Sequence, residues 1–476
     1  MKKEKINYMN LGVQIAEMVK STLGPKGMNK MVLQGGEAIL TNDGATIIQQ
    51  TNWNNPIGDM FKKLAASQEK ASGDGTTTAT IFAGQLLEKG VELLNKNVHP
   101  TTIISGYTMA KALAIQFIDA QGQEPNRQEI IKTTFGSKIE PELVDHFTEL
   151  ILGLDLDNLR IFKRDNSDPY SSMIIKGYAF PGFTVNDRMQ REFSGKIAVL
   201  DTKSQIDTSA VQVNSADELK KVQQMAKDHY KKIVDFLVEK KVGCVFFSDT
   251  NPELESYLTE KKIMSIVNYQ REHIDGVCRA CNAIAISDPE DLDENKFGEG
   301  IVRFEKDPNT IFVESKDSKL ETLVIAAGTE QVLLETERAI DDVIGVLKHL
   351  KKAVVGAGAI EIQTILHLEE IAAKVGGKEQ VAIRKFAEAL EMIPLVLAEN
   401  CGLDSIDILT KLKTLHLSGN KVVGVDPANG ISDAQVRGVM EPAEMKIHAI
   451  ASATDVANLI LKLDDIVQGD DGNEKK

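Results

Sequence analysis

The change of hydrophobic pattern along the chain constrains the fold most strongly. Residues 10–125 and the stretch from Thr329 onward carry apolar residues at helical spacing, such as Ile57, Phe61 and Leu64. The middle instead has short apolar runs separated by helical stretches, which is typical of an α/β layer. We therefore expect an α+β multidomain fold. A central α/β insertion would allow the two helical ends to fold together as one domain.

The same patterns predict individual elements. An early β-hairpin is expected from residues 31–33 and 38–41, joined by two glycines. The strands expected in the middle are 196–201, 242–247, 263–267 and 283–286, and the helices between them are 216–240, 252–261 and 271–281. Beyond the middle, helices are expected at 330–352, 359–374, 379–400, 405–415 and 441–463.

Charge and composition exclude several classes of protein. The 476 residues include 55 Lys and Arg against 70 Asp and Glu, a net charge of −15, which argues against nucleic-acid binding and against a basic membrane-surface role. No apolar run approaches the ~18 residues needed to span a bilayer, and no secretory signal is visible. Four cysteines in a chain of this length favour a reducing compartment, so we expect a cytoplasmic protein.

Two of those cysteines, Cys278 and Cys281, form a CxxC pair. A zinc site would want a second pair or nearby histidines, and none follows at the usual spacing. Metal binding or redox chemistry is one interpretation of the pair. Two small residues on a helix that faces a core are the other.

Five glycine-containing segments suit a nucleotide, although none is a Walker A loop. The first is Thr-Leu-Gly-Pro-Lys-Gly at 22–27, where glycines would admit a phosphate but a helix C-cap is equally good. The second is Thr-Asn-Asp-Gly-Ala-Thr at 41–46. Its Asp43 is either a structural turn residue or a carboxylate that orients a water or a metal ion.

The third segment, Gly-Asp-Gly-Thr-Thr-Thr at 73–78, is more specific because it begins a helix. A helix N-terminus offers free N–H groups and a positive dipole end. Asp74 is a hard oxygen ligand suited to Mg²⁺. An ordinary N-cap followed by threonines is the alternative.

The last two segments are more ambiguous. In Glu-Arg-Ala-Ile-Asp-Asp at 337–342, Arg338 and Asp342 are spaced for a surface ion pair, or one aspartate positions an attacking water. In Val-Gly-Ala-Gly-Ala at 355–359, small residues would accept a ring or ribose, or would pack helices tightly. Asp43, Asp74 and Asp342 would also suit a soluble Mg²⁺-dependent kinase or phosphatase.

Taken together and in this order, the motifs resemble those of the group II chaperonins, over essentially the whole chain. They are Leu-Gly-Pro-Lys-Gly at 23–27, Asn-Asp-Gly-Ala-Thr at 42–46, Gly-Asp-Gly-Thr-Thr-Thr at 73–78, Gly-Ala-Gly-Ala at 356–359 and Leu-Ala-Glu-Asn-Cys-Gly-Leu-Asp at 397–404. Further stretches are similar to the eukaryotic cytosolic chaperonin CCT (TRiC), and within it to the theta subunits: 27–31, 156–160, 278–281, 337–342 and 382–387.

The resemblance implies a group II chaperonin fold in three domains. These are a mainly helical equatorial domain (1–126 and 374–476), a hinge-like intermediate domain (127–176 and 328–373) and an α/β apical domain (177–327). The stretch 204–235 would be a helical protrusion that serves as a lid.

The resemblance also implies roles for single residues. Asp43 and Asp342 match the carboxylates that activate water, and Asp74 matches the Mg²⁺ ligand. The nucleotide-binding positions by this match are Leu23, Gly24, Pro25, Gly75, Thr76, Thr77, Thr78, Lys138, Gly356, Gly358 and Glu441. Theta-like subunits often have Asn-Asp-Ala and Gly-Asp-Gly-Thr-Asn. This chain has Asn-Asp-Gly and Gly-Asp-Gly-Thr-Thr, which favours a functional pocket.

The function implied by the resemblance is ATP-dependent protein folding, with ATP and Mg²⁺ as cofactors. ATP hydrolysis would close the lid of a cytosolic double ring around unfolded proteins such as actin and tubulin. The implied partners are other chaperonin subunits in a hetero-oligomeric double ring of eight, unfolded substrates and prefoldin. The alternative is a ring subunit that binds nucleotide but hydrolyses it slowly, with a structural and substrate-recognition role.

Overall fold

The chain forms two compact units with helices and sheets, which confirms the expected α+β multidomain class. The computed structural model describes residues 2–34, 37–136, 138–184, 189–203, 216–249, 252–267, 272–288, 291–306 and 309–463. Unit 1 comprises Met1–Thr148 and Leu334–Lys476, and unit 2 comprises Glu149–Leu333. Unit 1 is therefore built from both ends of the chain, with unit 2 inserted between them. The boundaries expected for three domains remain a prediction.

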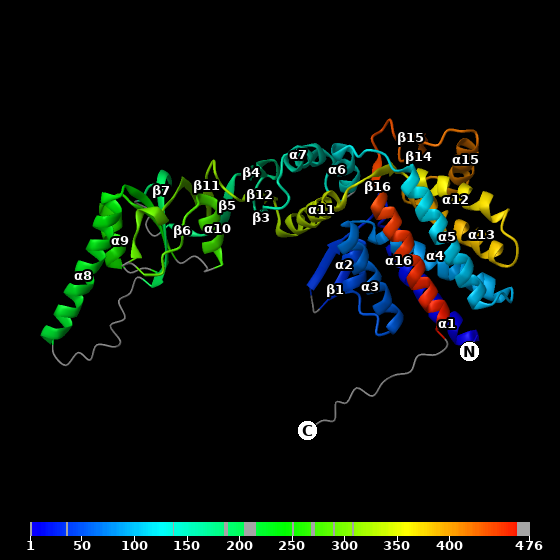
Figure 1. The fold of residues 1–476 in the computed structure, drawn as a ribbon, viewed down its shortest axis with the longest axis horizontal. Coiled ribbons are helices and arrows are strands. Elements are labelled where there is room, and N and C mark those ends of the chain that lie inside the picture. Colours follow the sequence, from blue (N-terminus) through cyan, green and yellow to red (C-terminus); the bar gives the residue numbers. More distant parts are fainter. Residues whose placement is uncertain are drawn as a thin grey trace, which may run out of the picture. The chain divides into compact units, whose positions relative to one another are not determined.

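Unit 1 is mainly helical (Figure 1). Its helices, two of which continue past its boundaries, are α1 (Lys2–Lys20), α2 (Gly44–Gln50), α3 (Pro56–Ser72), α4 (Thr76–Asn95), α5 (Pro100–Gln121), α6 (Arg127–Phe135), α7 (Pro141–Leu152), α11 (Glu330–His349), α12 (Ala359–Ala372), α13 (Glu379–Leu390), α14 (Met392–Asn400), α15 (Ser405–Leu417) and α16 (Ala443–Lys462). Its strands form three antiparallel pairs: β1 (Lys30–Gln34) with β2 (Glu37–Thr41), β13 (Ala353–Val355) with β16 (Met440–Pro442), and β14 (Val423–Asp426) with β15 (Gly430–Asp433).

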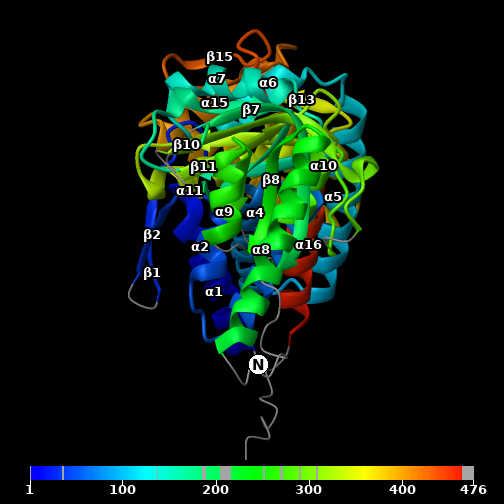
Figure 2. The same cartoon turned by 90° about the vertical axis from the view of Figure 1, so that its left-hand side faces the viewer.

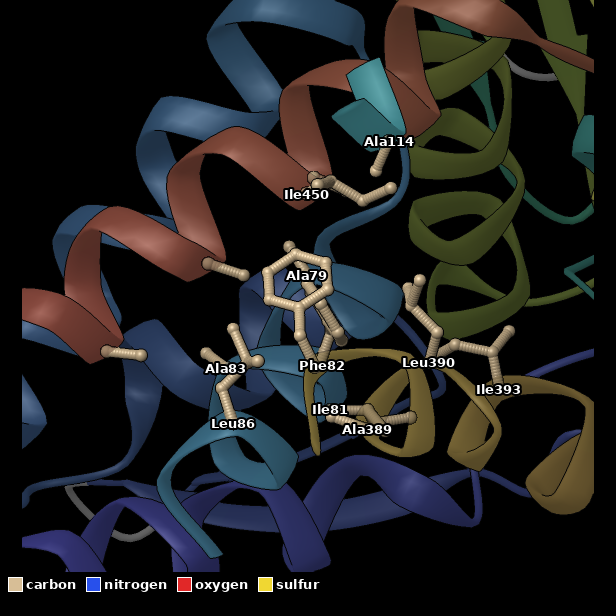
Figure 3. Packing of buried hydrophobic residues seen from close by; sticks show 14 of the residues in the cluster. Ala79, Ile81, Phe82, Ala83, Leu86, Ala114, Ala389, Leu390, Ile393 and Ile450 are labelled. Atoms are coloured by element: carbon tan, nitrogen blue, oxygen red, sulfur yellow. The ribbon is translucent and has the colours of Figure 1, made fainter. Parts of the chain in front are cut away.

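Helix α4 forms the centre of unit 1. It contacts α1, α3, α13 and α16, and its side chains are buried on every face. Phe82 packs edge to face on Phe386 of α13, with ring centroids 5.1 Å apart, among the alanine, leucine and isoleucine side chains of Figure 3. Because close packing holds α4 from all sides, the position of its N-terminus is fixed within the unit.

The first expected hairpin is present and the longest expected helix is divided. β1 and β2 pair in the register Met31–Leu40, and Figure 2 shows them as a narrow ribbon beside the helices of unit 1. The single helix expected over 379–400 is instead α13 and α14, which meet at Glu391. Pro394 accounts for the division, because its ring clashes with the carbonyl four residues earlier and it has no N–H to donate.

Unit 2 contains a seven-stranded mixed sheet in the order β5-β11-β10-β7-β8-β9-β6, with β7, β8 and β9 parallel to one another. Its strands are β5 (Gly177–Pro181), β6 (Phe183–Thr184), β7 (Glu192–Lys203), β8 (Val242–Asp249), β9 (Met264–Val267), β10 (Gly298–Lys306) and β11 (Asn309–Glu314). A smaller sheet joins β3 (Leu159–Arg164), β12 (Glu321–Ala326) and β4 (Met173–Ile175). The helices are α8 (Ala216–Glu239), α9 (Pro252–Glu260) and α10 (His273–Cys281).

The two faces of the large sheet are covered by different helices. Ile197 and Val199 of β7 belong to a core shared with α10, whereas Ala198 and Leu200 belong to a core shared with α8 and α9. This alternation follows from the two-residue period of a strand, and it confirms the expected α/β layer. The strand expected at 283–286 is wrong: only Ile286 makes a bridge, to Leu200.

Two further expectations concern unit 2. The segment 204–235 predicted as a lid begins at residues 204–215, which lie outside the described residues, and continues as α8. The CxxC pair lies on α10, where Cys281 is buried and Cys278 is half-buried in the core. Burial raises the pKa of Cys278 to about 11 and that of Cys281 to about 12, so both thiols stay protonated at neutral pH. These observations confirm the core interpretation of the pair.

No helix in the described part of the chain combines the length and the apolar character required to cross a membrane.

Candidate functional site

A cavity of about 410 Å³ opens in unit 1 at the N-terminus of α4. Its lining comes from both sequence segments of the unit, so the site exists only when the two ends of the chain have folded together. The residues expected at a nucleotide site that line it are Leu23, Gly24, Pro25, Asp43, Asp74, Gly75, Thr76, Thr77, Thr78, Lys138 and Glu441. Ile393, Leu397, Val425 and Pro427 give the cavity an apolar portion.

The turn between α3 and α4 presents backbone N–H groups to this cavity. Gly75 caps α4 with a φ of 87°, a left-handed conformation in which glycine is favoured and in which it offers no side chain to cap the helix. A Cβ at this position would come within 2.7 Å of Met445 Cγ and 2.9 Å of Gln68 Nε2. Because three threonine hydroxyls follow, the end of α4 is well suited to an anionic group.

Gln68, which sequence analysis missed, holds that turn in place. Its buried Nε2 lies 2.9 Å from the carbonyl oxygen of Asp74 and 3.2 Å from that of Met445 in α16. His448 Nδ1 lies 2.8 Å from Gln68 Oε1. The only signal in the sequence is a glutamine on the apolar face of α3, since two of its partners, Met445 and His448, lie more than 370 positions away.

Asp43 caps helix α2 beside the same turn. Its Oδ1 accepts a hydrogen bond from Ala45 N at 3.1 Å, and its Oδ2 accepts one from Thr46 N at 2.7 Å. The structural interpretation of Asp43 is therefore confirmed. Each oxygen retains a second lone pair, so a catalytic role remains a prediction.

Lys138 joins two of the expected carboxylates. Its Nζ lies 3.0 Å from Asp74 Oδ1 and 2.7 Å from Asp342 Oδ2. Burial alone would lower the pKa of Lys138, but the Asp342 and Asp74 carboxylates outweigh it and raise that pKa. The lysine therefore stays charged and holds the two acids together.

Asp342 lies on α11 and is joined to the site by its ion pair with Lys138. It does not itself line the cavity. Burial raises its pKa, Lys138 opposes the rise, and the nearby Asp74 and Asp43 charges reinforce it. A surface pair with Arg338 is therefore not the main interaction of Asp342. A carboxylate with a raised pKa is suited to accept a proton near neutral pH.

The loop at residues 22–27 is held against α14 by side-chain hydrogen bonds. Gly24 has a φ of 88°, and Asn400 Nδ2 donates hydrogen bonds to the carbonyl oxygens of Lys20, at 2.9 Å, and Leu23, at 2.8 Å. Asn400 belongs to a stretch quoted above for its resemblance, but its contact with Leu23 was not foreseen.

We expect Asn400→Ala to free this loop. The loss of two hydrogen bonds should cost about 1–2 kcal/mol of stability and weaken nucleotide binding several-fold, because Leu23 and Gly24 line the cavity. Calorimetric titration and thermal melting of the full chain would measure both effects. Asn420→Ala, at an exposed position, is the matched control. An unchanged affinity would contradict the assigned role of Asn400.

Gly356 and Gly358 flank the cavity instead of lining it. Ala357, between them, contributes to the lining, while Gly358 caps α12. A Cβ on Gly356 would come within 2.8 Å of Glu441 Oε2, so this glycine leaves room beside that carboxylate.

A buried charge network adjoins Glu441 on the side of α12 and α16. Lys446 Nζ lies 2.8 Å from Glu441 Oε1 and 2.8 Å from Glu361 Oε1. Burial alone would lower the pKa of Lys446, but Glu361 and Glu441 raise it overall. Sequence reasoning missed Lys446 and Glu361. The available signal was a charged residue on the apolar side of a helix, α16 for Lys446 and α12 for Glu361.

The donor set fits a nucleotide-bound Mg²⁺. Among the described residues, no group of three or more His, Cys, Asp or Glu side chains is arranged to hold a metal ion. Mg²⁺, however, needs only one or two carboxylates when phosphate oxygens complete its shell. Asp74 supplies such a carboxylate directly before the helix N-terminus that would face those phosphates.

Comparison with known proteins identifies the family of the chain. The model of the TCP-1/cpn60 chaperonin family matches residues 15–471. The chain is 34% identical to thermosome subunit alpha of Archaeoglobus fulgidus, over 98% of this chain and 91% of that protein. It is also 34% identical to a thermosome subunit of Pyrococcus horikoshii, over 95% of this chain and 89% of that protein. The identity to thermosome subunit 1 of Haloferax volcanii is likewise 34%, over 97% of this chain and 88% of that protein. This chain therefore belongs to the TCP-1/cpn60 chaperonin family, in its group II (thermosome/TCP-1) branch.

Proposed function

We propose that this chain is an ATP-dependent chaperone subunit that hydrolyses ATP with Mg²⁺ and couples hydrolysis to the enclosure of unfolded proteins. The observation that carries the proposal is the cavity at the N-terminus of α4, with Asp43 and Asp74 at its wall and Lys138 linking Asp74 to Asp342. An anion-binding helix end beside several carboxylates is suited to a phosphate chain with its metal ion.

In this proposal the parts of the cavity have separate tasks. Gly75 and the threonines 76–78 hold the phosphates, Leu23 to Pro25 close over them, and Lys138 responds to the terminal phosphate. Asp74 would hold Mg²⁺, which would neutralise phosphate charge. Asp342, with Asp43, would orient the attacking water and accept its proton. Glu441, beside Gly356, would bind the sugar.

Coupling to movement follows from the position of Asp342 on α11, which continues into unit 2. A water-positioning residue on such a helix makes hydrolysis depend on the arrangement of the units. Phosphate binding would attract Lys138 and thereby alter its pairing with Asp342. The apical α/β region would bind the unfolded substrate, for which we propose actin- and tubulin-like proteins.

We place this subunit in a cytosolic hetero-oligomeric double ring of eight, similar to CCT and nearest its theta subunits, with prefoldin as a further partner. The support is the set of theta-like stretches, including 156–160 and 382–387. The relatives named above are archaeal thermosome subunits, so a ring of fewer kinds of subunit is the competing arrangement.

The alternative function is a subunit that binds nucleotide but hydrolyses it slowly. Each oxygen of Asp43 already accepts one hydrogen bond from α2, which favours this alternative because only the second lone pairs remain to act on water. Steady-state hydrolysis that survives Asp342→Ala in this subunit of an intact ring would support it.

Native mass spectrometry of the endogenous protein, purified through a tag on this subunit, tests the proposal. We expect a particle of about sixteen chains that binds ATP. Eight kinds of chain would support the CCT placement, and a single kind would overturn it while leaving the chaperonin function intact. A monomer that is active on a small phosphorylated substrate would overturn the chaperone proposal in favour of a kinase or phosphatase.

A further inference from the structure

Helix α11 carries a glycine in its interior, Gly345, at a place where it comes very close to another stretch of backbone. A Cβ built on Gly345 would lie 2.8 Å from the Cα of Gly73, whereas carbon atoms that are not bonded normally stay about 3.5–4.0 Å apart. A Cβ built on Gly73 would lie 2.3 Å from the carbonyl carbon of Gly345 and 2.4 Å from the backbone nitrogen of Val346. The two backbones therefore touch directly, and the contact depends on the absence of a side chain on both glycines.

Both glycines are close in sequence to the carboxylates of the site. Gly73 ends α3 with a φ of 73° and directly precedes Asp74. Gly345 lies three positions after Asp342, so these two residues are neighbours on the surface of α11. Lys138 joins the same two acids, at 3.0 Å from Asp74 and 2.7 Å from Asp342. An ion-pair contact and a backbone contact thus hold α11 against the turn between α3 and α4.

That turn is supported from its other side by buried hydrogen bonds. Gln68 Nε2, on a fully buried side chain, lies within hydrogen-bond distance of the carbonyl oxygens of Asp74 and Met445. The buried Ser72 Oγ lies 3.0 Å from the carbonyl oxygen of Asp74. Gly345, by contrast, is half-buried and lies in the last part of its helix. A side chain at position 345 would press the turn against this support, so α11 is the partner that gives way.

We infer that Gly345 is a positioning residue for hydrolysis: because it has no side chain, α11 comes close enough to Gly73 to seat Asp342 beside the turn. This inference rests on the proposed function, in which Asp342 orients the attacking water. Glycine in the interior of a helix costs stability relative to alanine, and the close contact accounts for its presence here. Displacement of a catalytic group by about 1 Å lowers a rate by about 10²-fold.

The test replaces Gly345 with Ala in the full chain, within the assembly that it forms. A helical backbone accepts alanine readily, so the variant should fold. We expect ATP hydrolysis at saturating ATP to fall by about 10²-fold, while the ATP affinity from calorimetric titration stays within about threefold of the wild type, because threonines 76–78 keep their places. Gly376→Ala is the matched control, since a Cβ at this exposed position would have nothing within 4 Å, and its rate should equal that of the wild type.

Two further measurements separate positioning from general damage. An electron cryomicroscopy structure of the nucleotide-free Gly345→Ala assembly should show α11 farther from Gly73 by about 1 Å and Asp342 withdrawn from Lys138. Adding Gly345→Ala to an Asp342→Asn protein should cause little further loss of rate, because the glycine acts through that carboxylate.

The outcomes distinguish this inference from the proposed function. If the wild type hydrolyses ATP and Gly345→Ala does so at the same rate, or if α11 keeps its place in the variant structure, the inference alone is wrong. It is also wrong if the variant loses affinity as much as rate, or slows the Asp342→Asn protein by the full factor, since the glycine then acts on the turn and not through Asp342. If the wild type binds ATP without hydrolysing it, the proposed hydrolysis fails and the inference fails with it.

Discussion

Replacing Asp342 with Asn is expected to slow ATP hydrolysis at this site by about 10²–10⁴-fold, the usual contribution of general acid–base catalysis. The substitution preserves the shape of the side chain and removes the carboxylate that would accept the proton and that pairs with Lys138. Lys138 would keep its pairing with Asp74. ATP affinity should stay the same or rise, because one negative charge near the phosphates disappears.

Steady-state hydrolysis and ATP titration of the assembled protein would measure the two effects separately. Asp341→Asn is the matched control, because this exposed neighbour on α11 carries the same charge one residue away. Its rate should stay within about twofold of the wild type. An Asp342→Asn protein that hydrolyses ATP at near the normal rate would exclude Asp342 as the proton acceptor and favour the slowly hydrolysing alternative.

Replacing Lys446 with Met is expected to give the largest loss of stability. Removal of the ammonium leaves Glu361 and Glu441 buried without a counter-charge, which typically costs about 3–5 kcal/mol. The melting temperature should therefore fall by roughly 5 °C. Lys111→Met is the control, since its pair with Asp455 is more exposed and should contribute no more than about 1 kcal/mol.

Acidification should return part of that stability. Burial raises the pKa of Glu441, and the nearby Glu361 charge adds to the rise, whereas Lys446 opposes it. Without the ammonium, the pKa of Glu441 should therefore be higher still in the Lys446→Met variant. An acid with a raised pKa in the folded state destabilises that state when it is ionised. As the pH falls through that pKa, Glu441 becomes neutral and the loss of stability should shrink. A loss independent of pH would indicate a packing defect instead.

Local sequence patterns predicted most elements of the fold, because helical and strand periodicity is written in neighbouring residues. The β1–β2 hairpin and α15 are examples. The division of α13 from α14 was missed although Pro394 marks it, because the apolar period continues across the break. The strand expected at 283–286 reflects the limit of short apolar runs, which do not say whether a partner strand is available.

The site was predictable only in part. Glycine-rich motifs indicated the turn at Gly75 and the carboxylates Asp43 and Asp74, because the chemistry of phosphate binding is local to a helix end. Gln68 and Lys446 were not predictable in this way. Met445 and His448, which contact Gln68, and Glu361, which contacts Lys446, lie on other elements, and only the folded chain brings them within hydrogen-bond distance.

The split origin of unit 1 also bears on synthesis at the ribosome. Helix α4 is made long before α16, which covers one side of it. Unit 2 is contiguous in sequence and is free to acquire its core first. The apolar surface of α4 then stays exposed until α16 has been made. We therefore expect the nascent chain to be prone to aggregation during this interval, so that the protein itself needs protection while it is made.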